Sequence, residues 1–231
     1  MADDKGYTQG RLWARPGKVT KAAPVGLQPL MLGAARDSYL YVPASYLAQQ
    51  RSAPLVLLLH GAGGHARQGL DLLRSLADAT GLILLAPASR ERTWDLLVSR
   101  RYGPDAAMID RALEHVFSRY AVDPERLAIG GFSDGASYAL SLGLTNGDLF
   151  THVLAFSPGF MAPAGQIGSP RIFVSHGTRD RWLPIERCSR RVVPQLERAG
   201  YEVRYREFEG GHVVPPEISR EAVTWFTTAG D

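Results

Sequence analysis

Apolar residues gather in short runs along the chain, and three of these runs carry almost no polar residue. The runs 54–60 (PLVLLLH), 82–87 (LILLAP) and 126–132 (RLAIGGF) have the pattern of strands covered on both faces of a sheet. Further strands are expected at 38–43, 152–158, 171–177 and 202–208, the last because its apolar and polar residues alternate.

Between these runs, apolar residues recur at helical spacing. In 65–81 they fall on one face, and Gly81 is suited to end the helix. Further helices are expected at 104–120, 136–144, 184–200 and 216–226, and Pro194 would kink or divide the third of these. Alternating strands and helices predict right-handed crossovers, so the fold class is α/β with a mostly parallel central sheet flanked by helices.

The chain length of 231 residues fits one domain, and we find neither an internal repeat nor a linker. Residues 1–231 are therefore expected to form a single domain. Residues 1–25 are polar and contain Gly and Pro, which favours a loosely ordered lead-in segment or an early edge strand. No stretch approaches ~18 uninterrupted apolar residues, so no membrane span is expected.

Composition and charge narrow the class of partner. The formal charge is +3, and the basic residues are scattered, which favours a solvated surface over a nucleic-acid patch. Cys188 is the only cysteine, so the chain has neither an internal disulfide nor a cysteine-rich zinc site. The N-terminal residues lack the apolar segment of a signal peptide, and a cytoplasmic location is therefore expected.

Residues with catalytic chemistry follow several of the predicted strands, at the sheet edge where α/β proteins bind ligands. Ser133 follows the run 126–132 and lies between Gly131 and Gly135 in the motif G-x-S-x-G. A sharp strand-to-helix turn with this motif needs small residues on both sides because its backbone is crowded, and it exposes the serine hydroxyl. The pattern predicts a nucleophile, with an ordinary glycine-rich turn as the alternative.

A serine nucleophile needs a general base and an acid that orients the base. With this kind of turn, the chain order is serine, acid, histidine. His212 follows the last predicted strand in EGGHVVPP, and Asp180 follows an earlier strand in HGTRDRWLP. We predict His212 as the base and Asp180 as the orienting acid. The alternatives are a surface histidine and an aspartate paired with Arg179 or Arg181.

Attack on a carbonyl creates a negatively charged oxygen, which two backbone N–H groups usually hold. The first is expected from Asp134, directly after the nucleophile. The second is expected from the loop LHGAGG, with Ala62 as first choice and Gly61 as second. The side chain of His60 is expected to hold this loop rather than to transfer protons.

Four segments together resemble the α/β-hydrolase superfamily, and within it the small bacterial carboxylesterases and phospholipase-type serine hydrolases, which include acyl-protein thioesterases. These segments are LHGAGG (59–64), GFSDGA (131–136), HGTRD (176–180) and GGH (210–212). The resemblance extends over about residues 38–226. In that family the triad and the oxyanion donors match Ser133, Asp180, His212, Ala62 and Asp134 of this chain.

The resemblance implies an α/β-hydrolase fold with a minimal lid. It implies hydrolysis of carboxylic esters with short-to-medium acyl chains through an acyl-enzyme, with a small-molecule ester as partner and neither a metal nor an organic cofactor. Thioester or peptide hydrolysis by the same triad stays open, as does a non-catalytic ligand-binding protein on the same scaffold.

Two features depart from the familiar pattern. Asp134 stands where thioesterase-type members usually have glutamine. The chain also has no long insertion that could form a large lid, because the longest irregular stretch near the site is only 88–103.

Trp94 and Trp182 flank the expected cleft and are candidates, with Gly61, to line a substrate pocket; packing beneath a loop is the alternative for both tryptophans. The arginines within 88–103 either favour anionic substrates or belong to a solvated loop; they are Arg90, Arg92, Arg100 and Arg101.

Overall fold

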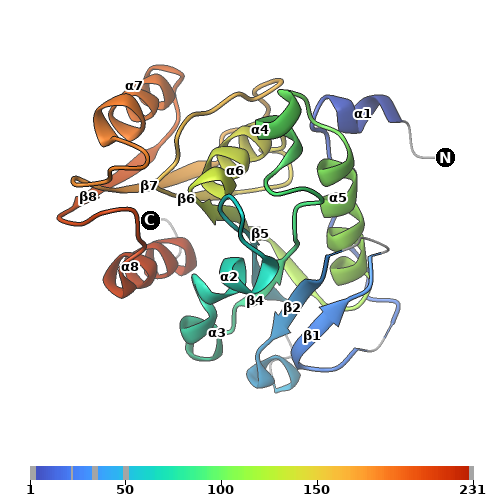
Figure 1. Cartoon of the computed structure of the whole chain (residues 1–231). Helices are drawn as coiled ribbons and strands as arrows, with labels where there is room; N and C mark the ends of the chain where they lie inside the picture. Colours follow the sequence, from blue (N-terminus) through green and yellow to red (C-terminus); the bar gives the residue numbers. More distant parts are fainter. Residues whose placement is uncertain (1–3, 22, 33–35, 49–51, 229–231) are drawn as a thin grey trace.

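The computed structural model describes residues 4–21, 23–32, 36–48 and 52–228, which form one eight-stranded sheet between two layers of helices (Figure 1). The strands are β1 Gly26–Leu30, β2 Ser38–Val42, β3 Ala53–Leu59, β4 Ile83–Ala86, β5 Val122–Phe132, β6 His152–Phe156, β7 Arg171–Gly177 and β8 Val203–Phe208. Their order across the sheet is β1-β2-β4-β3-β5-β6-β7-β8. Only the pairs β1–β2 and β2–β4 are antiparallel, so the prediction of a mostly parallel sheet is confirmed.

Helices cover both faces of this sheet, and the pattern within β3 shows why its sequence is continuously apolar. Leu55, Leu57 and Leu59 pack in one core cluster with residues of α5 Pro104–Phe117 and α6 Asp134–Thr145. Val56 and Leu58 point the other way and pack with residues of α2 Ala66–Asp71, α3 Arg74–Thr80 and α8 Pro216–Thr227. Successive side chains of a strand alternate between faces, and here both faces are buried.

Three helical predictions need correction. The expected helix 65–81 is two helices, α2 and α3, because i→i−3 hydrogen bonds tighten the chain at Leu72 and Leu73. The stretch 88–103 contains a short helix, α4 Asp95–Ser99. The segment 184–200 is divided at Cys188, between the 3-10 turn η2 Ile185–Arg187 and α7 Ser189–Arg198, whereas α7 continues through Pro194.

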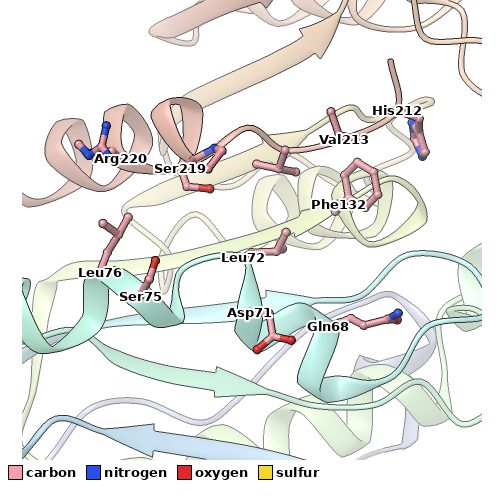
Figure 2. Close-up of a pocket in the computed structure, with 12 residues that line it drawn as sticks. Gln68, Asp71, Leu72, Ser75, Leu76, Phe132, His212, Val213, Ser219 and Arg220 are labelled. Carbon is pink, nitrogen blue, oxygen red and sulfur yellow. The ribbon is translucent and has the colours of Figure 1, made fainter. Parts of the chain in front are cut away.

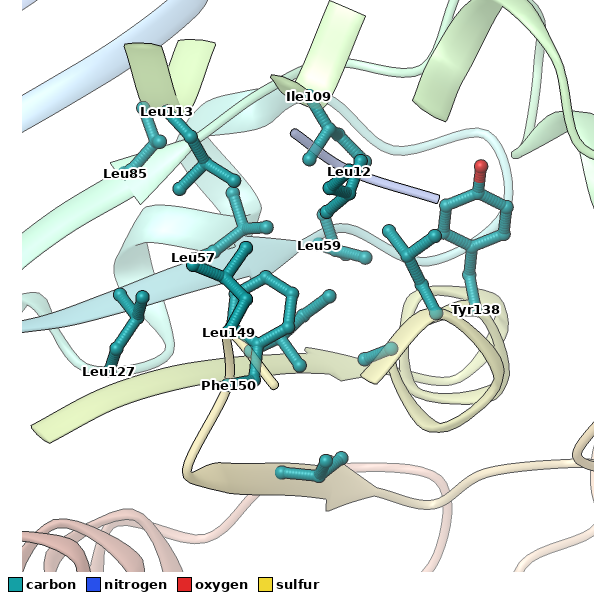
Figure 3. Packing of buried hydrophobic residues seen from close by; sticks show 14 of the residues in the cluster. Leu12, Leu57, Leu59, Leu85, Ile109, Leu113, Leu127, Tyr138, Leu149 and Phe150 are labelled. Carbon is teal, nitrogen blue, oxygen red and sulfur yellow. The ribbon is translucent and has the colours of Figure 1, made fainter. Parts of the chain in front are cut away.

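The N-terminal segment differs from the expected loose lead-in or edge strand. Within the described residues it forms a short helix, α1 Asp4–Thr8, and then an extended run that is not part of the sheet. Leu12 is fully buried in the core cluster that also contains Leu59 and Ile109 (Figure 3). The Oδ1 atom of Asn146 accepts the Leu12 N–H at 2.9 Å, and the edge strand is β1 instead. Residues 1–3 and 22 of this prediction lie outside the described residues.

The short chain segment Ala44–Leu47 forms a further 3-10 turn, η1, after β2. Over the described parts of the chain, none of the helices combines the length and the apolar composition that crossing a bilayer requires.

Candidate active site

Ser133 lies in a sharp turn between β5 and α6, with φ 58° and ψ −120°. A positive φ is unusual for serine and marks a strained backbone that surrounding contacts hold in place. The two glycines of the motif are required by close packing. A Cβ atom on Gly135 would lie 2.2 Å from the Leu59 carbonyl oxygen, and one on Gly131 would lie 2.7 Å from the same oxygen. The G-x-S-x-G spacing therefore follows from the contact of this turn with β3.

The three residues that the sequence singled out lie in one hydrogen-bonded row. The Nε2 atom of His212 lies 2.8 Å from the Ser133 Oγ atom. On the other side of the ring, Nδ1 lies 2.5 Å from the Asp180 Oδ2 atom. Asp180 follows β7 and His212 follows β8, so neighbouring parallel strands present both residues at the same edge of the sheet.

The carboxylate of Asp180 is held on both oxygens. Its Oδ1 atom accepts the N–H groups of Trp182 and Leu183, each at 2.9 Å, which leaves Oδ2 facing His212. Burial by itself raises the pKa of this carboxyl, but the Leu183 N–H and the His212 ring outweigh burial and lower the pKa below its usual value. Asp180 is thus an ionised, oriented partner of the imidazole.

A second histidine lies behind this carboxylate. The Nε2 atom of His176 is 2.8 Å from the Leu183 carbonyl oxygen and 3.3 Å from the Asp180 Oδ2 atom. Burial lowers the pKa of His176, which favours the neutral ring, and the Ser189 hydroxyl lies 2.7 Å from its Nδ1 atom. These contacts support Asp180 from behind, while His212 is the ring that lies against the Ser133 hydroxyl.

The loop after β3 lies against the nucleophile. A Cβ atom on Gly61 would be 3.3 Å from the Cβ atom of Ser133, so the absence of a side chain allows the close approach. Among the described residues, the Ala62 N–H donates to no protein acceptor. Asp134 is the first residue of α6, and the first N–H groups of a helix have no acceptor within the helix. Both groups are thus available to a ligand.

His60 is buried and holds this loop. The Ser89 N–H donates to the Nε2 atom of His60 at 3.0 Å, so the ring proton is on Nδ1, which donates to the Gly61 carbonyl oxygen at 2.8 Å. Burial lowers the pKa of His60 to about 4, so the ring is neutral near pH 7. The contacts agree with the expected structural role.

The two tryptophans are placed very differently. Trp94 is fully buried, and its Nε1 atom donates to the His60 carbonyl oxygen at 2.9 Å. The prediction that Trp94 lines a substrate pocket is therefore wrong; it packs between His60 and Tyr138 beneath the loop. Trp182 is 82% exposed beside Asp180, at the surface near the triad.

Sequence reasoning also missed a partner of Asp134. The Thr93 hydroxyl donates to the Asp134 Oδ2 atom at 2.7 Å. No local sequence pattern predicts this contact, because Thr93 precedes Asp134 by 41 residues. The position of Thr93 depends on how its segment packs against the loop after β3.

Two adjoining cavities open beside the triad. One has a volume of about 420 Å³ and lies between α2, α3 and the start of α8, with His212 at one end and Arg220 at the other (Figure 2). Its wall between these ends is mixed: apolar side chains such as Leu72, Leu76 and Val213 alternate with polar ones such as Asp71 and Ser75. The second, of about 270 Å³, reaches Gly61 and Ala62. Both cavities share Gln68, Leu72 and Phe132.

Comparison with known proteins connects this arrangement to hydrolases. A model of the phospholipase/carboxylesterase family matches residues 103–227, which is more than half of the chain. An acetylxylan esterase of Coprinopsis cinerea is 32% identical over 144 residues, which cover 58% of this chain and 37% of that protein. A putative esterase, NocK, of Nocardia uniformis subsp. tsuyamanensis is 27% identical over 213 residues, which cover 88% of this chain and 56% of that protein.

The chain thus spans between about a third and somewhat over half of the length of the curated relatives that it matches. Among solved structures, the S-formylglutathione hydrolase FrmB from Staphylococcus aureus has a TM-score of 0.71 at 15% sequence identity, with 92% of this chain and 100% of that chain covered. This structural likeness confirms the α/β-hydrolase fold that the sequence predicted.

Proposed function

Because the chain belongs to the phospholipase/carboxylesterase family, we propose that it is a serine hydrolase that cleaves carboxylic esters. The observation that carries the proposal is the continuous row from the Ser133 hydroxyl through the His212 ring to the Asp180 carboxylate. A nucleophile, a base within 3 Å and a carboxylate that orients the base are the requirements of acyl transfer through a covalent intermediate. No step of this reaction needs a metal or an organic cofactor.

In the proposed reaction, the Ser133 Oγ atom attacks the ester carbonyl carbon while His212 Nε2 accepts the hydroxyl proton. The resulting imidazolium is stabilised by Asp180. The N–H groups of Ala62 and Asp134 are proposed to hold the oxyanion. The intermediate collapses when the C–O bond to the alcohol breaks, and His212 returns the proton to the departing alkoxide oxygen. Water then attacks the acyl-enzyme with His212 again as base, and the acid and free Ser133 are released.

The cavity beside His212 supports short-to-medium chains on the substrate. The apolar side chains in its wall, among them Leu72 and Leu76, suit an alkyl chain, since burying apolar surface contributes roughly 25 cal/mol per Å². Its volume of about 420 Å³ lies in the range of ligand pockets for small molecules. We propose that the substrate chain lies along Leu72 and Leu76, with the reacting carbonyl at the His212 end.

Thioester hydrolysis is a second candidate, because FrmB is described as an S-formylglutathione hydrolase and shares this fold. The same triad attacks either carbonyl, and only the leaving group differs. Matched oxygen esters and thioesters of one acyl group separate the two by their kcat/KM values, and the matched amide tests the peptidase alternative.

A fluorophosphonate probe tests the proposal as a whole. We expect the probe to label the wild-type protein, whereas Ser133→Ala removes labelling and His212→Ala slows it strongly. An activated short-chain ester should be hydrolysed by the wild type only. A wild type that neither reacts with the probe nor hydrolyses esters would favour a non-catalytic ligand-binding protein, and labelling that persists in Ser133→Ala would assign another nucleophile.

We also propose that residues 1–231 form a single domain and that the protein is cytoplasmic. The single domain is supported by one sheet in which all eight strands of the described residues are hydrogen-bonded neighbours. The cytoplasmic location is supported by a lone, buried cysteine, because disulfides are typical of oxidising compartments. Fractionation of the producing cells with an antibody against the chain tests the location.

A further inference from the structure

Three consecutive residues connect the two chain segments that carry the proposed oxyanion donors. The carbonyl oxygen of Arg92 accepts the Gly63 N–H at 2.7 Å, directly after Ala62. The indole of Trp94 donates to the carbonyl oxygen of His60, on the other side of the same loop. Between them, Thr93 donates to the carboxylate of Asp134 at the start of α6. We call residues 92–94 the bridging segment.

The bridging segment is itself firmly held. Trp94 is fully buried and stacks on Tyr138 of α6 at a ring distance of 5.3 Å. Next to it, Asp95 and Asp105 each accept the backbone N–H of the other, at 2.8 and 2.9 Å. The Tyr138 hydroxyl also donates to Asp95. A rigid base of this kind allows a single side chain to fix the position of a neighbouring loop.

We propose that Thr93 is a positioning residue that sets the Asp134 N–H relative to the Ala62 N–H in the oxyanion hole. The proposal rests on the proposed function and deepens it. It also assigns a task to the Asp134 carboxylate, which is the acceptor of the bridge. A hydroxyl that donates to a carboxylate forms a strong, charge-assisted hydrogen bond, and the 2.7 Å distance agrees with that type.

The expected effect is on the rate of the chemical step. Oxyanion donors must lie about 2.7–3.1 Å from the oxygen of the tetrahedral intermediate, and losing one donor lowers kcat by about 10²–10³. A donor that is displaced but present should cost less. The ground-state ester makes weaker use of these donors, so substrate binding should change little.

Thr93 suits an experiment better than its two neighbours. The Arg92 contact uses the backbone, and substitution of Trp94 would disturb the core. Thr93→Val keeps the side-chain shape and removes only the hydroxyl, Thr93→Ser keeps the hydroxyl, and Ser99→Ala is the matched control. The Ser99 hydroxyl lies on α4, where it donates to the backbone oxygens of Asp95 and Arg101 and contacts neither donor segment.

With an activated ester, we expect Thr93→Val to lower kcat roughly tenfold with KM unchanged, while Thr93→Ser stays within about twofold of the wild type and so does Ser99→Ala. Thermal unfolding of each variant monitors the fold. A wild-type kcat in Thr93→Val, an effect on KM alone, or an equal loss in Thr93→Ser would each overturn the proposal.

Asp134→Ala removes the same hydrogen bond from its other end and keeps the inference testable if Thr93→Val folds poorly. If the two residues act through one contact, the double variant should lose no more kcat than Asp134→Ala alone. Losses that multiply would contradict the bridge. A wild type without esterase activity would instead remove the proposed function, so the two failures are distinguishable.

Discussion

The Oδ2 atom of Asp180 lies 2.5 Å from the Nδ1 atom of His212, while its other oxygen accepts two backbone N–H groups. The backbone contacts fix the direction of the carboxylate, and the carboxylate in turn fixes the ring. His212 therefore presents Nε2 to Ser133 with the proton on Nδ1, the tautomer that a general base needs.

Asp180→Asn tests this orientation. An amide can donate to His212 where the carboxylate accepts, which favours the wrong ring tautomer, so we expect kcat to fall by about 10⁴ with little change in folding. Steady-state kinetics and thermal unfolding measure the two effects. Asp123→Asn, at a surface ion pair with Arg126, is the control and should keep its activity. Equal kcat in Asp180→Asn and the wild type would contradict the role of Asp180.

The cavity beside His212 predicts how chain length is selected. Leu76 lies in its wall, away from the His212 end (Figure 2). Leu76→Trp should fill that part and lower kcat/KM for an octanoyl ester by about tenfold relative to an acetyl ester. A chain-length series on 4-nitrophenyl esters measures the change. A parallel loss on all chain lengths would show that substrate does not occupy this cavity.

The two tryptophans near the site should differ in their contribution to stability. Trp94→Phe loses a buried hydrogen bond and leaves a void, and we expect the free energy of unfolding to fall by about 2 kcal/mol. Trp182→Phe, at a residue that is 82% exposed, should change it by less than about 0.5 kcal/mol. Urea denaturation gives both values, and similar losses in the two variants would be inconsistent with their placement.

The N-terminal segment predicts a dependence of stability on pH. Asp148 accepts hydrogen bonds from Arg11 and Arg15, and chiefly the Arg11 contact lowers the pKa of Asp148 from 3.8 to about 2. Because the folded-state pKa is the lower one, the stabilisation is complete above about pH 4 and declines as the pH falls toward 2.

Asp148→Asn should therefore be less stable than the wild type at pH 7, and the difference should be smaller at pH 3. The contribution of this ion pair to stability is modest, because the side chains of Arg11 and Asp148 are both partly exposed. Urea denaturation at pH 7, 5 and 3 measures it. A difference that is constant with pH would mean that the charge of Asp148 does not contribute.

The sequence by itself determined the features that depend on residues close together along the chain. Alternating apolar runs and helical repeats depend on neighbouring residues, and they predicted the strands from β2 to β8 and most of the helices. The crowding of a strand-to-helix turn required Gly131 and Gly135, and the order of loops along a parallel sheet selected Asp180 and His212, which the structure brings together.

Tertiary packing decided which side chains are buried and which distant residues come into contact. Trp94 and Trp182 have similar sequence surroundings, yet one is buried and the other exposed, because burial depends on which distant segments cover a side chain. Leu12 enters the core through contacts with residues about a hundred positions away, which a polar lead-in does not reveal. The same holds for Thr93 and Asp134. Residue type identified both as polar, and only the fold brought the hydroxyl and the carboxylate within hydrogen-bonding distance.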